Sequence, residues 1–362
     1  LGRMMIDWWT SKEGRSMSFW TPSTKNVLAN LSIDWLGKRR IGYVVSSVLI
    51  VAGIASFATR GFELGVDFKG GYSYNVEFDR SIDVEVDALR TTLTDVFGSV
   101  PVVKAVDSEN TFNVTTSYLI NETSDDAPEL VLQTLYEGVV SYTGANIDAE
   151  RFKQTDATGT HVTSSSRVGP TIADDIKKSS VEATIFALLL IFFYIFIRFS
   201  KWQYSLGAVA ALFHDTLIVL GIFSLLHGVL PFSLEIDQAF IAALLTVIGY
   251  SINDTVVVFD RIREFTGLYS GKSKKDVINM AINSTVSRTI ITSLTTLFVV
   301  SILLVFGGSS IKGFAFALVI GILVGTYSSI FVATPVMSDL TGDIHPKDTK
   351  KARSFSKAAA IK

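Results

Sequence analysis

Hydrophobic residues gather in six long stretches, and one long polar stretch separates the first of these from the other five. The expected membrane spans are residues 41–58, 181–199, 205–226, 238–259, 286–306 and 314–337. Each holds about 20 residues, which is the length that an α-helix needs to cross the hydrocarbon core of a bilayer. The pattern therefore predicts a polytopic α-helical membrane protein with a bundle of six transmembrane helices.

The polar stretch, residues 60–180, is rich in Asp, Glu, Thr and Asn. Alternating apolar positions predict strands, and helical spacing predicts two helices between them. The expected strands are 72–78, 102–106, 111–118 and 160–168, and the expected helices are 86–97 and 127–139. The order β-α-β-β-α-β is that of the ferredoxin-like arrangement. We therefore expect a ferredoxin-like α+β domain between the first and second spans.

Three polar segments lie outside these units. Residues 1–40 are expected to form an N-terminal segment or linker, of which residues 31–36 follow the membrane surface. Residues 260–285 are expected to form a loop between the fourth and fifth spans. Residues 338–362 are expected to form a basic tail without regular structure.

Composition agrees with a membrane protein, because 48% of the 362 residues are hydrophobic and the mean hydropathy is +0.40. The chain has no Cys, which excludes disulfides, thiolate metal sites and cysteine nucleophiles. The glycine-rich stretch at 65–71 precedes a strand and lacks the Gly-Lys-Ser/Thr ending of a phosphate loop, so it predicts a tight turn. We expect neither an enzyme nor a cofactor, a metal or a nucleic-acid partner. Because the first residue is Leu1, we expect the chain to be part of a longer protein.

Basic residues are distributed unevenly between the connecting segments. One set of segments holds Arg3, Lys12, Arg15, Lys25, Lys38, Arg39, Arg40, Arg198, Lys201, Arg261, Arg263, Lys272, Lys274, Lys275 and the basic tail. The two short loops on the other side hold only Lys312. Because cytoplasmic loops carry the excess of Lys and Arg, both termini are expected in the cytoplasm. The polar domain is then expected on the outer, periplasmic side of a bacterial inner membrane.

The fourth span contains the strongest candidate for a functional group, Asp254. A carboxyl group inside a membrane helix costs roughly 2.5–3.5 kcal/mol, so it usually faces the protein interior and has a function there. Arg288 enters the fifth span from the same side and is expected at a similar depth, where it would pair with Asp254. The alternatives are a static ion pair between two helices and an Arg288 side chain that extends to the interface.

Other polar residues within the spans are candidates for a proton path. His214 and Asp215 lie inside the third span, and a His–Asp pair can relay protons because imidazole titrates near neutral pH. The alternative is a hydrogen-bonded packing pair. Four further residues are expected to line a hydrated path or to hold helices together, namely Thr246, Ser251, Asn253 and Thr292. In the last span, Gly321, Gly325, Ser328 and Ser329 have the spacing that permits close helix packing.

Several stretches together resemble one protein family. They are GVDFKGGYSYNVEF (65–78), RVGPTIADDIKKSS (167–180), ALFHDTLIVLGIFSLL (211–226), ALLTVIGYSINDTVVVFDRIRE (243–264), SRTIITSLTTLFVV (287–300), FGG (306–308) and GILVGTYSSIFVATPV (321–336). The set is similar to the SecF half of the SecD/SecF protein-export family in the RND superfamily, and covers nearly everything from residue 33 to 337. Residues 1–40 resemble the linker after the last SecD helix in fused SecDF proteins of Bacteroidota.

The resemblance implies an RND-type six-helix bundle, an extracytoplasmic ferredoxin-like domain and use of the proton-motive force in Sec-dependent protein export. It implies as partners SecD, or the SecD half of the same polypeptide, together with the SecYEG translocon and the translocating preprotein. Asp254 and Arg288 fall on the family's proton-pathway positions at the SecD interface. Some relatives carry an acidic residue after FGG where this chain has Lys312 and Gly313, so no site is transferred there.

Two other functions remain as alternatives. One is an RND-type exporter of small molecules or lipids, which would need a larger substrate-collecting domain than the single small one expected here. The other is an assembly factor that stabilises the translocon without transporting anything, with Asp254 and Arg288 as a structural pair.

Overall fold

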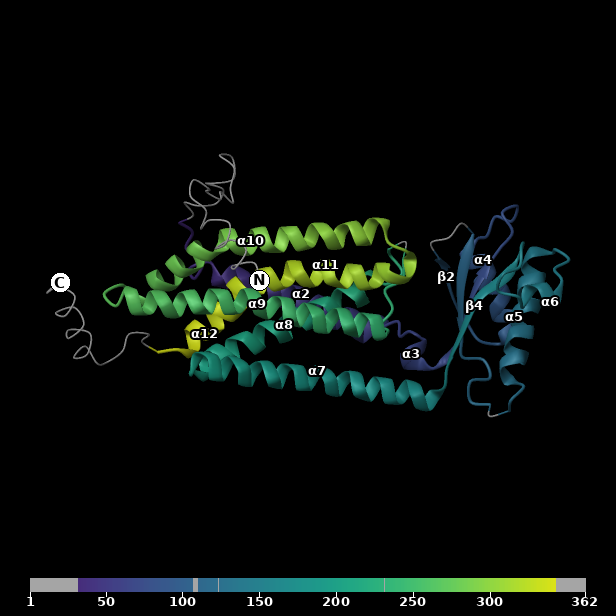
Figure 1. Ribbon diagram of the computed structural model, residues 1–362, viewed down its shortest axis with the longest axis horizontal. Coiled ribbons are helices and arrows are strands. Elements are labelled where there is room, and N and C mark those ends of the chain that lie inside the picture. Colours follow the sequence, from purple (N-terminus) through teal and green to yellow (C-terminus); the bar gives the residue numbers. More distant parts are fainter. Residues whose placement is uncertain (1–31, 107–109, 123, 231, 343–362) are drawn as a thin grey trace, which may run out of the picture.

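The computed structural model describes residues 32–106, 110–122, 124–230 and 232–342. Long helices run side by side along the long axis of the molecule, and a small sheet domain sits at one end of them (Figure 1). We call this end of the bundle the sheet end and the other the opposite end. Within the described residues, six helices are long and apolar enough to cross a membrane, in agreement with the sequence prediction.

The bundle helices are longer than the apolar stretches that predicted them. They are α2 (Arg39–Arg60), α7 (Pro170–Phe199), α8 (Trp202–Leu226), α9 (Gln238–Leu268), α10 (Lys274–Phe306), α11 (Ser309–Ser328) and α12 (Thr334–Leu340). The sixth span comprises α11, a π-helical turn η1 (Ser329–Ala333) and α12. Pro335 follows the π turn and has no N–H to donate to the carbonyl four residues before it. The π turn accommodates this missing bond, and Thr334 Oγ1 donates to Ser329 O at 2.8 Å.

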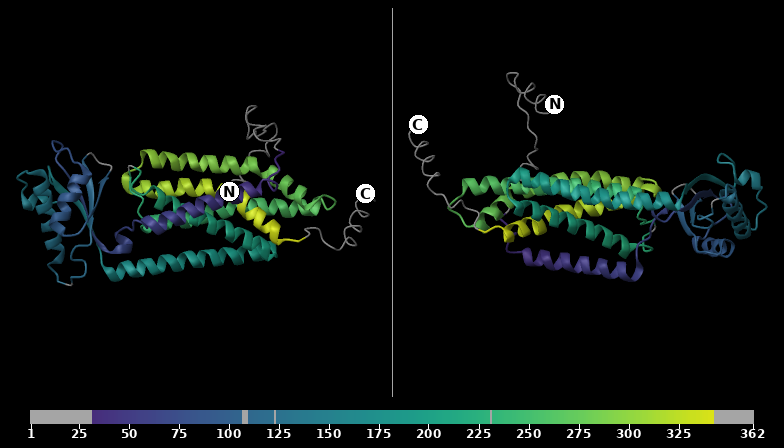
Figure 2. Two further views of the ribbon diagram at one scale, coloured as in Figure 1. Left: turned by 180° about the vertical axis from the view of Figure 1, so that it is seen from behind. Right: turned by 90° about the horizontal axis from the view of Figure 1, so that it is seen from below.

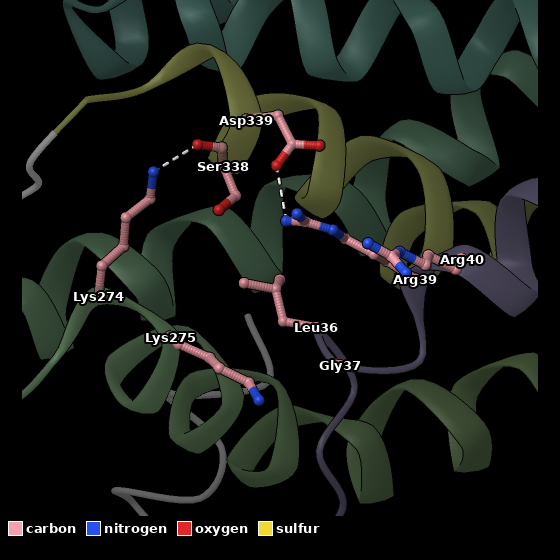
Figure 3. A pocket seen from close by; sticks show the side chains of 8 residues that line it. All are labelled: Leu36, Gly37, Arg39, Arg40, Lys274, Lys275, Ser338 and Asp339. Atoms are coloured by element: carbon pink, nitrogen blue, oxygen red, sulfur yellow. Dashed lines mark hydrogen bonds and ion pairs between the residues drawn. The ribbon is translucent and has the colours of Figure 1, made fainter.

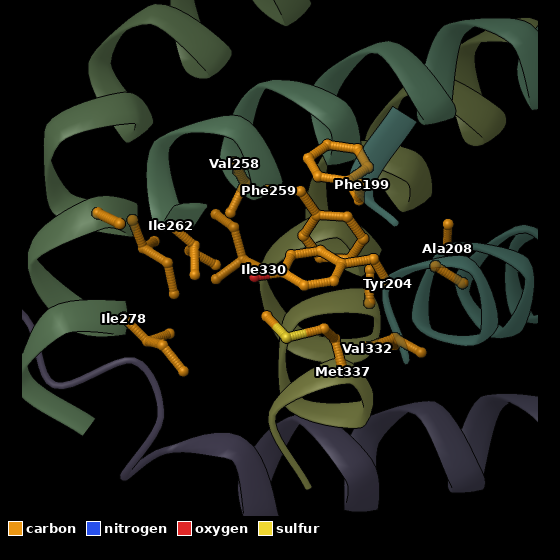
Figure 4. Close-up of a cluster of buried hydrophobic side chains, with 14 of the residues drawn as sticks. Phe199, Tyr204, Ala208, Val258, Phe259, Ile262, Ile278, Ile330, Val332 and Met337 are labelled. Carbon is orange, nitrogen blue, oxygen red and sulfur yellow. The ribbon is translucent and has the colours of Figure 1, made fainter. Parts of the chain in front are cut away.

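Residues 260–285, expected as a loop, are helical except for the turn at 269–273, so that expectation was wrong. The polar residues occupy one face only: Arg261 pairs with Glu264, for example, and both are on the outside. The other face remains apolar, and Ile262 and Ile278 are fully buried. They belong to a core cluster that also contains Tyr204, which stacks on Phe199 (Figure 4). A stripe of apolar residues along one helix face packs against the core, and this burial stabilises the helix where its other face is polar.

The sheet domain has the expected ferredoxin-like topology. Its elements are β1 (Gly71–Glu77), α4 (Val86–Phe97), β2 (Val102–Val106), β3 (Thr111–Thr116), α5 (Ala127–Thr143) and β4 (His161–Val168). The antiparallel sheet has the strand order β2-β3-β1-β4. One face of the sheet packs on α4 and α5 around Leu89, Leu93 and Leu135, which are fully buried. The helical turns α3 (Val66–Lys69) and α6 (Ala149–Phe152) were not predicted, because four residues carry too little periodicity.

A single residue, Gly169, separates β4 from α7. The segment 170–180, expected within the sheet domain, is therefore the first part of a helix of 30 residues. At 1.5 Å per residue such a helix is about 45 Å long, which exceeds the thickness of the hydrocarbon core. The sheet domain is consequently mounted directly on a helix of the bundle.

Lys104 on β2 makes a second connection between the sheet domain and the bundle. Its ammonium group pairs with Glu235, which precedes α9, and lies 3.5 Å from Glu63, which follows α2. It also donates to Ser233 Oγ at 2.7 Å. Burial lowers the pKa of Lys104 to about 8 and Glu63 opposes this shift, so the group is charged at neutral pH. We call Lys104 and its partners Glu63, Ser233 and Glu235 the seat of the domain.

The described part of the N-terminal segment docks on α10. Trp35 Nε1 donates to Asn283 Oδ1 at 2.8 Å, and Leu36 N donates to Asn279 Oδ1 at 3.0 Å. Leu36 is buried in the bundle core, so this part of the segment packs against the helices, and the expectation that residues 31–36 follow the membrane surface stays a prediction. Residues 1–31 and 343–362 lie outside the described residues, and the expectations for them stay predictions.

Gly321 on α11 lies against Val247 on α9, and a Cβ at residue 321 would overlap the Val247 side chain. Gly321→Ala is therefore expected to lower the free energy of unfolding by about 1–3 kcal/mol, as overpacking does. Gly249→Ala is the matched control, because a Cβ there meets no atom within 4 Å. Reversible unfolding in mixed micelles measures both variants. Equal effects of the two substitutions would mean that close packing of α9 and α11 does not depend on Gly321.

Lys104→Met removes the cation of the seat and leaves Glu63 and Glu235 facing each other. Glu63 keeps its contact with His227 Nδ1 at 2.9 Å, but the two carboxylates lose the cation that they share. The connecting segments 61–65 and 232–237 are therefore expected to exchange their amide hydrogens faster. Lys153→Met is the control, because Lys153 pairs with Glu129 in the same domain but away from the bundle. Hydrogen exchange read by mass spectrometry compares the variants. Unchanged exchange in Lys104→Met would show that other contacts hold the domain.

Candidate functional site

Asp254 is buried within the bundle, with 3% of its surface exposed. Ser293 Oγ of α10 donates to Asp254 Oδ2 at 3.4 Å, and Ser293 itself is 2.7 Å from Thr326 Oγ1 of α11. The carboxyl group therefore lies where α9, α10 and α11 meet. Among the described residues this long hydrogen bond is its only one, so the carboxylate is poorly stabilised for a group shielded from water.

Arg288 forms no ion pair with Asp254 among the described residues, contrary to the expected pairing. It is exposed, and it lines a pocket with Val257, Asp260 and Glu264. Arg288 precedes Ser293 by five residues on α10, so its backbone lies about 7 Å nearer the opposite end than that of Ser293. The expected role of Arg288 on a proton path stays a prediction. Arg288 instead lies on an exposed side of α10, next to the residues of α9 that line the same pocket.

His214 and Asp215 form the expected pair, with His214 Nδ1 at 2.9 Å from Asp215 Oδ1. The second ring nitrogen, Nε2, lies 2.8 Å from Ser46 Oγ on α2. Asp215 is fully buried, and its Oδ2 accepts hydrogen bonds from Ser251 at 2.7 Å and from Ser328 at 2.8 Å. These contacts join α2, α8, α9 and α11. We call Ser46, His214, Asp215, Ser251 and Ser328 the Asp215 network.

The two carboxylates lie near each other because Ser251 and Asp254 are one turn apart on α9. Ser251 thus binds Asp215 on the face of α9 that also carries Asp254. The π turn follows Ser328 directly, and such turns are frequent at functional sites. The two acidic groups and the hydroxyls between them form one polar region inside an apolar bundle.

Of the four residues expected to line a path, only Ser251 belongs to this region. Thr246 donates to Ala242 O of its own helix, and Thr292 donates to Arg288 O of its own helix. Both are exposed, and so is Asn253. These three side chains therefore lie on outward faces of α9 and α10, where they meet lipid or another protein.

Sequence reasoning missed Ser46 and Tyr327. Tyr327 OH lies 3.1 Å from Ser46 Oγ and donates to Gly42 O at 2.7 Å, which extends the Asp215 network toward α2. A serine or tyrosine in an apolar span is common, and nothing in the local sequence distinguishes these two. Within the described residues, no group of His, Cys, Asp and Glu has the arrangement of a metal site.

Ser251→Ala removes one donor from Asp215 and is expected to lower the free energy of unfolding by about 1 kcal/mol, as for buried hydrogen bonds between membrane helices. Ser47→Ala is the matched control, because Ser47 is exposed on α2 beside Ser46 of the network. Unfolding in mixed micelles, followed by tryptophan fluorescence, gives both values. If Ser251→Ala were as neutral as Ser47→Ala, the network would not hold the bundle together.

Comparison with known proteins identifies two family models along the chain. Residues 148–343 match "Protein export membrane protein SecD/SecF, C-terminal", and residues 55–82 match the "SecD/SecF GG Motif". The protein translocase subunit SecF of Rhodothermus marinus is 47% identical over 315 residues, which is 87% of this chain and 95% of the relative. The corresponding protein of Haemophilus influenzae is 36% identical, over 85% of this chain and 86% of the relative.

The fold is similar to that of a solved structure, the translocon-associated membrane protein SecDF from Thermus thermophilus. The TM-score is 0.73 at 31% sequence identity, with 92% of this chain covered. A second SecDF structure, in a super-membrane-facing form, gives a TM-score of 0.62 at 30% identity over 98% of this chain. The chain spans about two fifths of these SecDF chains, namely 41% and 43%. From its family models, relatives and fold together, the chain belongs to the SecD/SecF family of protein-export membrane proteins, within which it is a SecF.

Proposed function

We propose that this chain works together with SecD in Sec-dependent protein export and uses the proton-motive force to promote preprotein translocation on the periplasmic side. The observation that carries the proposal is the environment of the Asp254 carboxyl group. It is buried in the bundle, it has one long hydrogen bond to a hydroxyl, and no cation pairs with it among the described residues. A carboxyl group in that position can take up and release a proton at low cost, because neither form is held by strong partners.

A partner is needed to complete the membrane part of the protein. Asn253 and Thr246 on α9, together with Arg288 and Thr292 on α10, present polar groups on outward faces of the bundle. An arginine facing lipid within a bilayer is costly, so such a face is normally covered by protein. The solved SecDF relatives are more than twice the length of this chain, and SecD is the partner proposed to cover the face.

The proposed orientation follows from the basic residues at the opposite end of the bundle. Arg39, Arg198, Arg263 and Lys274 lie at that end, as the positive-inside rule requires of the cytoplasmic side. The sheet domain is then periplasmic and both termini are cytoplasmic, in the inner membrane of a bacterium.

Movement in the bundle can reach the sheet domain through two connections. Gly169 links β4 to α7 with no intervening loop, and Lys104 ties β2 to the segments that enter and leave the bundle. In the proposed cycle, proton binding at Asp254 alternates with pairing of Arg288 either to Asp254 or to a carboxylate of SecD. The helices α9 and α10 shift against the partner, and the sheet domain tilts with them.

The energy available is sufficient for such a cycle. One charge moved through the membrane potential supplies about 2.3 kcal/mol per 100 mV. A free energy of that size changes a two-state equilibrium severalfold to tens of fold. The SecYEG translocon and the preprotein are the further partners proposed, and the chain itself is proposed to catalyse no chemical reaction.

The test is preprotein export into vesicles that hold SecYEG together with the full assembly of SecD and this chain, with and without an imposed proton gradient. Asp254→Asn is expected to abolish the gradient-dependent part of export and to leave the remainder. Asp260→Asn is the control, because that carboxylate lies on the same helix but pairs with Arg198 near the membrane boundary. Export by this variant is expected to keep its response to the gradient.

The alternatives give different outcomes in the same assay. If Asp254→Asn lowered export equally in both conditions and the complex with SecD dissociated, the chain would be an assembly factor. If export stayed fully responsive to the gradient, Asp254 would not lie on the proton path.

A further inference from the structure

His214 and Asp215 lie near the middle of α8 and are shielded from water, with 6% and 1% of their side-chain surfaces exposed. They begin a row of hydrogen bonds that reaches α11 and α2. Its contacts are Asp215 Oδ1 to His214 Nδ1 at 2.9 Å, His214 Nε2 to Ser46 Oγ at 2.8 Å, Ser46 Oγ to Tyr327 OH at 3.1 Å, and Tyr327 OH to Gly42 O at 2.7 Å. We call these residues the proton chain.

Each hydrogen bond contains one hydrogen atom, and the proton chain can be counted from its fixed end. Gly42 O is a carbonyl oxygen, so Tyr327 must donate to it. A tyrosine hydroxyl has a single hydrogen, so Ser46 must donate to Tyr327. Ser46 also has a single hydroxyl hydrogen, so Nε2 of His214 must donate to Ser46. The ring nitrogen Nε2 therefore carries a proton.

The contact between His214 and Asp215 needs a further proton. Two bare lone pairs at 2.9 Å would repel each other, so a proton lies between Nδ1 and Oδ1, on one atom or the other. Together with the proton on Nε2, the pair holds two, which is one more than a carboxylate beside a neutral imidazole. The pair is then an imidazolium with a carboxylate, or a neutral imidazole with a carboxylic acid. Both forms have zero net charge.

The location of the pair in the bundle also favours the extra proton. A carboxylate beside a neutral imidazole would have a net negative charge, which is costly within the hydrocarbon core. The other partners of Asp215 are Ser251 and Ser328, which are neutral donors and cannot cancel that charge. Asp254 lies one turn from Ser251 on α9 and is itself acidic, so it adds no positive charge. The extra proton removes the net charge without a cationic side chain.

Helix α2 lies at the edge of the bundle, where it packs on α8 and on the sixth span (Figure 2). Its first turn is tied to α12 by the ion pair of Arg39 and Asp339 at 2.6 Å (Figure 3). Two turns further along α2, Ser46 links the helix to both α8 and α11. Without the proton on Nε2, Ser46 would have to donate to the ring of His214, and its contact with Tyr327 would contain no hydrogen. The extra proton therefore supplies one of the links of α2.

We propose that His214 and Asp215 form a second proton-binding site, which holds one proton more than a carboxylate and a neutral imidazole would. This proton keeps Ser46 hydrogen-bonded to Tyr327 and so joins α2 to the sixth span. The site is separate from Asp254 and retains its proton as part of the packing of α2, α8 and α11. The inference does not rest on the proposed proton cycle, because it follows from the hydrogen bonds of the proton chain.

The test is nitrogen NMR of the full chain in lipid bilayers, with histidine labelled with ¹⁵N. The signals of His214 are those that disappear in His214→Gln. At neutral pH, Nε2 of His214 is expected to show the chemical shift and the one-bond coupling of a protonated nitrogen. A bare Nε2, with the only ring proton on Nδ1, would overturn the proposal.

Tyr327→Phe tests whether the proton chain requires this proton, because it leaves the Ser46 hydroxyl free to donate to Nε2. The ratio of protonated to bare Nε2 is compared over the pH range in which the fold stays intact. It is expected to fall about fivefold, since one buried hydrogen bond contributes about 1 kcal/mol. An unchanged ratio would overturn the link between the proton and the contact of Ser46 with Tyr327.

Tyr250→Phe is the matched control. It removes the same hydroxyl group from a partly buried tyrosine on α9, which bonds Thr296 Oγ1 at 3.3 Å outside the proton chain. Its ratio of protonated to bare Nε2 is expected to stay within twofold of the wild type. Equal changes in both variants would indicate a general effect of repacking and would overturn the proposal.

Discussion

The hydrocarbon core of a bilayer offers no hydrogen-bond partners, so a carboxyl group inside it must be satisfied by the protein itself. Asp215 meets this requirement fully, because His214, Ser251 and Ser328 surround it. The helices α8, α9 and α11 must approach closely to supply these partners. Gly325 permits the approach, since a Cβ there would stand 2.9 Å from the Ser251 side chain. The arrangement of the bundle therefore depends on one buried carboxylate and on the small residues beside it.

Asp254 differs from Asp215 although both are buried. Among the described residues it has one hydrogen bond, of 3.4 Å, while Asp215 has three of 2.9 Å or less. A fully satisfied group is suited to holding helices together, and a poorly satisfied one is suited to changing its protonation state. The less satisfied group also contacts α10 through Ser293, and Arg288 is exposed on the same helix. The structure thus separates a carboxyl group with several close hydrogen bonds from one with a single long hydrogen bond.

The sheet domain is joined to the bundle at one end of the helices. Gly169 and the seat around Lys104 connect the domain to α7, α2 and α9. Because α2 and α9 also contribute Ser46 and Ser251 to the Asp215 network, two of the helices that hold the domain are held to each other through this network.

Local patterns in the sequence were enough to predict the six spans and the ferredoxin-like order of strands and helices, because hydropathy and periodicity are properties of neighbouring residues. They also singled out Asp254, His214 and Asp215, since a charge in an apolar run is visible in the sequence alone. The prediction of a loop for residues 260–285 was wrong because polar residues cover one helix face, and the apolar residues of the buried face are spaced among them. Which way Arg288 points and which hydroxyls reach Asp215 depend on contacts between helices more than 30 residues apart. Only the packed bundle decides these, because a side chain's partner across a helix interface is set by the crossing of the two helices and not by its own sequence neighbours.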